Sequence, residues 1–208
     1  SSFLSICMII IAYSTNSNWY LQYDKVYSMD SGWVFEWIYP YITYYDFRHP
    51  LLSIFTFPVW AITSCISNFL LPGSLSIVIK AIFLQIINSQ LLILTGLLLK
   101  KITNNKIIFI MYIFSFQTVL YTLFLEKYQL CTFLLVLYVY TICTNYKKSN
   151  FSLISSASIM PTSSVIGISE LLVNDKLKNK IKKILKIIIS TILIFICLGR
   201  IYVFKYGF

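Results

Sequence analysis

Three small groups of ionisable side chains lie next to long apolar stretches of this sequence. Asp30 lies in a polar, aromatic segment, Arg48 and His49 directly precede an apolar run, and Glu126 and Lys127 separate two further runs. An ionisable group costs about 2.5 to 3.5 kcal/mol at the middle of a membrane helix, so those that occur near apolar runs are candidates for function. We therefore take these five residues as the candidate site.

The chemistry that the first two groups could perform together is the transfer of a sugar from a lipid phosphate. The Asp30 carboxylate could deprotonate an acceptor hydroxyl, or it could hold a divalent metal ion that does so. Arg48 and His49 could neutralise the departing phosphate, because cationic side chains form charge-assisted hydrogen bonds with phosphate oxygens. The carboxylate is thus the catalytic candidate, and its need for a metal stays open.

Each group also has a simpler structural interpretation. Asp30 could be solvated in an acidic external loop, and Arg48 could extend its side chain to the lipid headgroups. His49 could mark only the start of a helix, since a proline follows it and proline is favoured in the first turn. Glu126 and Lys127 could pair with each other in a polar turn. The residues alone leave both interpretations open.

The composition predicts the elements that must position these residues. Of 208 residues, 58% are hydrophobic and 12% are charged, and the mean hydropathy is +0.79. A soluble domain cannot cover that much apolar surface, so lipid must be the solvent for much of the chain. We expect an all-α, multi-spanning transmembrane helical bundle in the cell membrane, with membrane lipid as a partner.

The net charge of +10 fits this class of protein better than it fits a nucleic-acid-binding protein. Most of the lysines lie between apolar runs rather than along one face, which is typical of loops anchored at the cytoplasmic surface. We therefore expect no nucleic acid partner. The five cysteines lie inside apolar runs without a CxxC pair, so they indicate helix packing rather than disulfides or a zinc site.

Seven apolar runs of helical composition follow one another along the chain. They cover residues 3–13, 51–71, 75–99, 107–125, 130–143, 151–173 and 185–204. The first is too short to cross a bilayer, which takes roughly 20 apolar residues. We expect the chain to begin inside a helix, and residues 1–208 to form a single, incomplete transmembrane domain.

The segments between the runs predict the topology. Residues 14–48 are rich in Trp and Tyr and poor in positive charge, so we expect an external loop with an interfacial helix over 32–45. Residues 174–186 are rich in lysine and predict an interfacial helix on anionic cytoplasmic lipid. Because positively charged loops favour the cytoplasmic side, we expect Lys100 and Lys101 to be cytoplasmic. This requires that one segment within 51–99 is re-entrant or does not cross the membrane. Residues 126–129 then lie on the external side.

The ordered set of these features resembles the polyprenyl-phosphate-dependent glycosyltransferases of the GT-C superfamily, relatives of the protein mannosyltransferases. The features are a partial first helix, a long external loop with Asp30, the stretch Asp46-Phe47-Arg48-His49-Pro50-Leu51-Leu52, and the insert Leu125-Glu126-Lys127-Tyr128-Gln129. The resemblance implies a polyprenyl-phosphate-linked sugar donor, a catalytic Asp30, Arg48 and His49 beside the lipid phosphate, and Glu126 or Lys127 lining the same cavity. It also implies that this chain is the amino-terminal part of a longer protein.

A non-enzymatic membrane protein, either a transporter fragment or an accessory subunit, is the alternative. Transporters place charged groups and broken helices near the middle of the bilayer. The candidates are Lys80, Gln85, Asn88 and Gln90, with Pro161 and Gly167 in a later run. The simpler interpretation of these residues is hydrogen bonding between helices.

Overall fold

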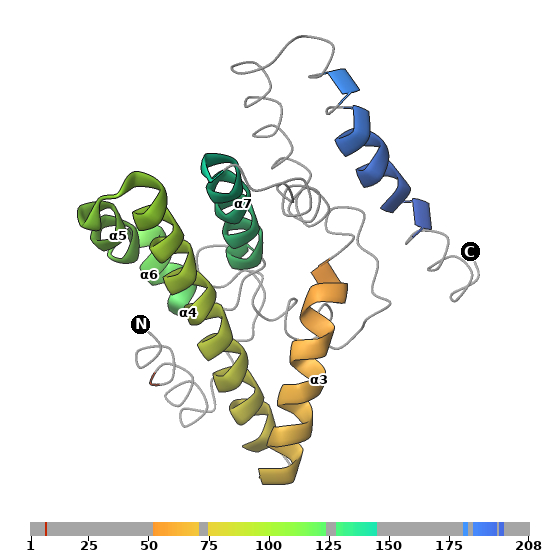
Figure 1. Cartoon of the computed structure of the whole chain (residues 1–208). Helices are drawn as coiled ribbons and strands as arrows, with labels where there is room; N and C mark the ends of the chain where they lie inside the picture. Colours follow the sequence, from red (N-terminus) through yellow and green to blue (C-terminus); the bar gives the residue numbers. More distant parts are fainter. Residues whose placement is uncertain are drawn as a thin grey trace.

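The computed structural model describes Cys7 and residues 52–70, 75–123, 128–144, 181–182, 185–194 and 196–197. All regular secondary structure in this part of the chain is α-helical, as the apolar runs predict (Figure 1). The helices are α3 (Leu52–Leu70), α4 (Leu75–Thr103), α5 (Lys106–Ile113), α6 (Phe116–Leu123) and α7 (Tyr128–Cys143), followed by a C-terminal helical segment, Leu185–Ile194.

Helix α4 is the centre of the described fold. It is the longest helix, at 29 residues, and it contacts α3, α5, α6 and α7 (Figure 1). Helix α3 contains two small polar residues, Thr63 and Ser67, which lie one turn apart and are both buried. Small residues at this spacing let two helices approach closely. Helix α4 thus organises the other helices around itself.

The turn between α4 and α5 is shorter than the basic stretch 100–106 suggests, because Lys100 and Lys101 belong to the last turn of α4. Asn104 ends the helix with a φ of 51°, a left-handed conformation that asparagine adopts more readily than most residues. Asn105 then caps α5, since its side-chain oxygen accepts a hydrogen bond from the Ile107 backbone N–H at 2.8 Å. Two asparagines therefore reverse the chain.

The apolar run 107–125 predicts one helix, whereas the structure divides its described part into α5 and α6. The division falls at Phe114 and Ser115. Ser115 Oγ accepts a hydrogen bond from the Thr118 backbone N–H at 3.2 Å and donates one to the Tyr112 carbonyl at 2.9 Å. The serine hydroxyl thus caps both helix ends at the break.

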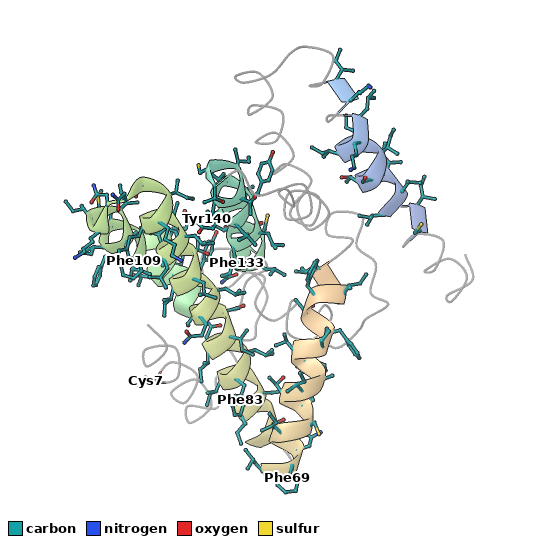
Figure 2. All side chains as sticks on the ribbon, viewed as in Figure 1. Cys7, Phe69, Phe83, Phe109, Phe133 and Tyr140 are labelled. Atoms are coloured by element: carbon teal, nitrogen blue, oxygen red, sulfur yellow. The ribbon has the colours of Figure 1, made fainter. Side chains whose placement is uncertain are left out.

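Burial in the described residues is the reverse of that in a soluble protein. More polar than apolar side chains are fully buried, while large apolar side chains are exposed. The buried polar residues are Thr56, Thr63, Ser67, Gln85, Asn88, Ser89, Thr95, Thr118 and Gln129, and the exposed apolar ones include Ile62, Phe69, Ile107, Met111 and Phe116. Phe69 projects from the end of α3 next to the start of α4 (Figure 2). Water would disfavour this distribution.

One helix in the described part of the chain is long and apolar enough to cross a membrane. It is the segment Ile82–Thr103 of α4. Its 22 residues span about 33 Å at 1.5 Å per residue, similar to the thickness of a hydrocarbon core. The apolar helices Ile54–Leu70, Tyr128–Cys143 and Leu185–Ile194 are shorter.

Several expected elements lie outside the described residues. They are the external loop 14–48 with its interfacial helix, the run 151–173, and most of the lysine-rich stretch 174–186.

Candidate functional site

All five candidate site residues lie outside the part of the chain that the structure describes. These are Asp30, Arg48, His49, Glu126 and Lys127, and the same holds for Pro161 and Gly167. The described residues contain no Asp, Glu or His, so their charged side chains are all lysines. No group of three potential metal ligands occurs among them. The site that can be built from the described residues is therefore polar and uncharged at its centre.

The centre of this site is one backbone carbonyl that two glutamines share. Gln85 of α4 donates from Nε2 to the Tyr121 carbonyl at 3.2 Å, and Gln129 of α7 donates to the same oxygen at 3.0 Å. Tyr121 lies in the last turn of α6, where backbone carbonyls have no partner within their own helix. We call Gln85, Tyr121 and Gln129 the glutamine hub, which joins three helices at one atom.

The hub is closed to solvent. Gln85 has 0% and Gln129 1% of its surface exposed. Buried amides in an apolar environment are costly without partners, and the shared carbonyl provides an acceptor for the Nε2 group of both glutamines. The ring of Tyr121 also stacks against that of Tyr128 at the start of α7, with 6.1 Å between the centroids. The hub therefore fixes the end of α6 to the beginning of α7.

Further polar side chains extend the hub along α4. Ser89 is fully buried and donates to the Gln85 carbonyl at 2.9 Å, which keeps its hydroxyl within its own helix. Asn88 is also buried, at 4% exposure, but its Nδ2 has no hydrogen-bond partner in the part of the chain that the structure describes. A buried amide donor of this kind costs about 1 to 3 kcal/mol and can bind an additional acceptor.

A second polar contact lies nearer the basic end of α4. The Tyr112 side chain hydrogen-bonds with Thr95 of α4 and Thr118 of α6. It reaches them because Gly96 allows α5 to pack closely on α4. A Cβ atom at Gly96 would lie 2.9 Å from Cδ2 of Phe109 and 3.1 Å from Cδ1 of Tyr112. We call the contact of Gly96 with Phe109 and Tyr112 the glycine crossing, and Figure 2 shows Phe109 beside α4.

The four transporter candidates on α4 separate into two kinds. Gln85 and Asn88 are buried with Ser89 in what we call the polar layer of α4, whereas Gln90 is exposed. Lys80 is half-buried, with its Nζ 4.7 Å from the centre of the Trp60 ring on α3. A cation over an aromatic face is stabilised by the ring quadrupole. Lys80 therefore contributes to the α3–α4 contact rather than to the glutamine hub.

The sequence alone did not identify Gln129, Ser89 or Thr95 as parts of a site. A signal for the α4 residues exists, since polar or small residues recur at 85, 88, 89, 95 and 96 with the spacing of one helix face. No such pattern marks Gln129, whose role depends on the position of α6. Among the cysteines, Cys131 is buried and suits helix packing, while Cys65, Cys143 and Cys197 are exposed.

No protein-family model matches this sequence, and no curated protein and no solved structure matches it. The resemblance to GT-C glycosyltransferases therefore rests on the sequence motifs alone.

Proposed function

We propose that this chain is a multi-pass protein of the cell membrane. The observation that carries this proposal is the reversed burial, in which polar side chains lie between helices and apolar ones face outward. The positions of the lysines on α4 support it as well. Lys80 and Lys100 are about 30 Å apart along the helix at 1.5 Å per residue, which matches the hydrocarbon thickness.

The function that we propose is transfer of a sugar from a polyprenyl phosphate to an acceptor hydroxyl on the external face. In this reaction the Asp30 carboxylate takes the proton of the acceptor hydroxyl, whose oxygen then bonds to the anomeric carbon of the sugar. The bond between that carbon and the phosphate oxygen breaks, and polyprenyl phosphate leaves with its charge neutralised by Arg48 and His49. The order of the motifs around these residues in the sequence supports this assignment.

The described helices contribute a rigid support to this proposal. Gln129 is fixed to α6 and α4 through the glutamine hub, and it follows Glu126 and Lys127 closely in sequence. A site residue gains precision when it is attached to an element held by packing and hydrogen bonds. The hub is therefore a positioning element for the start of α7.

The proposed reaction can be tested by turnover of a polyprenyl-phosphate sugar in membranes that contain the protein. Asp30→Asn keeps the size of the side chain but removes the base, so the rate should fall by about 10² to 10⁴-fold. Arg48→Lys keeps the charge but loses the planar fork, so it should raise KM more than it lowers kcat. Near-normal turnover of Asp30→Asn at normal expression would contradict the catalytic assignment.

Transport is the second candidate function, and the unpartnered Nδ2 of buried Asn88 favours it. A solute that passes through the polar layer would use this donor, whereas sugar transfer at the external face would not. Asn88→Leu should therefore abolish uptake of a transported solute in vesicles and leave sugar transfer unchanged. If Asn88→Leu changes neither activity, the transport candidate is wrong.

A further inference from the structure

The turn between α4 and α5 concentrates positive charge at one end of the described fold. Lys100, Lys101 and Lys106 lie within seven residues, with Lys101 and Lys106 exposed and Lys100 half-buried. No acidic residue lies in this stretch or elsewhere in the described part of the chain to neutralise them. The turn is thus a basic surface.

Apolar side chains are exposed directly beside these lysines. Ile107, Ile110 and Met111 of α5 have 61%, 53% and 65% of their surface exposed. Exposed apolar side chains next to exposed lysines are typical of a segment at the boundary between headgroups and hydrocarbon. A soluble polyanion such as a nucleic acid would neutralise the lysines but leave these apolar side chains in water.

The C-terminal helical segment shows the same combination. Lys186 of this segment and Lys182 shortly before it are exposed, and Leu185, Ile188 and Ile189 are exposed as well. This segment shares a buried cluster with α7, because Ile187 and Tyr138 belong to one hydrophobic cluster against which Val139 and Ile142 pack. In Figure 1 its first residues lie in the upper half of the view, as the α4–α5 turn does, but on the opposite side of α7.

Helix α7 connects the two basic stretches. The Nζ of Lys101 lies 6.0 Å from the centre of the Tyr140 ring. Tyr140 follows two residues after Tyr138, which packs with Ile187 of the C-terminal segment. Two stretches that are about 80 residues apart in the sequence therefore reach the same end of the fold. In a bilayer, both stretches would then face the same leaflet.

We propose that Lys100, Lys101, Lys106, Lys182 and Lys186 form one binding surface, the basic rim, for the headgroups of anionic lipids. The inference rests on the proposed membrane location and names the lipid that this end of the protein prefers. Phosphate headgroups would contact the lysines while the acyl chains cover the exposed apolar side chains of α5 and of the C-terminal segment.

The chain offers a closely matched control for this proposal. Lys101 and Lys80 both belong to α4 and both lie over an aromatic ring, on Tyr140 and Trp60 respectively. Replacing either with Gln removes one charge and one cation–π contact from the same helix. Only Lys101 belongs to the basic rim, so only Lys101→Gln should change lipid preference.

The experiment compares binding of phosphatidylglycerol with that of phosphatidylcholine to the full chain in neutral detergent. Binding of phosphatidylglycerol should be the tighter of the two, should weaken about fivefold for Lys101→Gln, and should stay unchanged for Lys80→Gln. The variant with all five rim lysines changed to Gln should lose the preference for phosphatidylglycerol. Equal binding of both lipids by the native chain, or equal effects of the two single variants, would overturn the proposal.

Extraction of membranes with alkaline carbonate separates this inference from the proposed function. Rim variants that stay in the membrane pellet but lose the preference for phosphatidylglycerol support the basic rim. If the native chain stays in the pellet but shows no preference, the basic rim is wrong and the membrane location stands. Release of the native chain by carbonate would contradict the membrane location itself.

Discussion

The glutamine hub and the glycine crossing join helices to α4 in two different ways. At the hub, Gln85 and Gln129 bring long polar side chains to the Tyr121 carbonyl, so the contact depends on directional hydrogen bonds. At the crossing, Gly96 has no side chain, and the rings of Phe109 and Tyr112 fill the space that a Cβ would occupy. One contact depends on what the side chains donate, and the other on the space that is left free.

The difference follows from the solvent that we propose for these helices. In lipid, apolar side chains gain little by leaving the solvent, so helices associate through close packing and through hydrogen bonds instead. Close packing fails abruptly when volume is added. A shared hydrogen bond fails gradually, because one donor can remain when the other is removed. Substitutions at three places test this contrast.

The largest effect is expected at the glycine crossing. Gly96→Leu places a whole side chain where even a Cβ would lie 2.9 Å from Phe109 Cδ2, so α5 must move away from α4. We expect a loss of about 3 kcal/mol in the free energy of unfolding, measured by denaturant titration in detergent micelles. Leu97→Phe adds volume to the next residue of α4, which is exposed, and should leave the stability unchanged. Equal effects of both variants would show that the crossing is not tightly packed.

The glutamine hub should show a smaller and non-additive effect. Gln85→Met and Gln129→Met each remove one donor to the Tyr121 carbonyl while the other donor remains, so each should cost about 0.6 kcal/mol. The double variant leaves that carbonyl without either glutamine and should cost about 1 kcal/mol more than the sum of the two single variants, a total that stays below the loss expected for Gly96→Leu. The same unfolding titration on the two single variants and the double variant gives a double-mutant cycle. If the losses in the free energy of unfolding simply add, the two glutamines act independently.

The smallest effect is expected at Ser115, which connects the two regions because it separates α5 at the crossing from α6 at the hub. Ser115→Ala removes the side-chain acceptor of the Thr118 N–H and should cost about 0.5 kcal/mol. Ser115→Asn retains a capping oxygen and should restore most of this loss in the same assay. A stability of Ser115→Ala equal to that of the native chain would show that the break does not depend on the serine cap.

Local patterns were sufficient to predict α3, α4 and α7 of the helices that the structure describes. The run 51–71 corresponds to α3 (Leu52–Leu70), and the run 130–143 corresponds to α7 (Tyr128–Cys143) within two residues at each end. Helix formation in an apolar run is a local property, because backbone hydrogen bonds are satisfied within the segment itself. The candidate residues Asp30, Arg48, His49, Glu126 and Lys127 also come from the sequence alone, as charged groups beside apolar runs.

Only the tertiary structure decided how the helices meet. The run 107–125 contains no proline or glycine that would predict a break. Its division at Ser115 depends on the serine acting as a helix cap, and the sequence alone does not distinguish this serine from one in the middle of a helix. Gln85 and Gln129 are 44 residues apart, and what connects them is a backbone carbonyl of a third helix, which has no signature in side-chain type. Gly96 likewise acquires its role from Phe109 and Tyr112, because the cost of a Cβ depends on which atoms the fold brings within 3 Å.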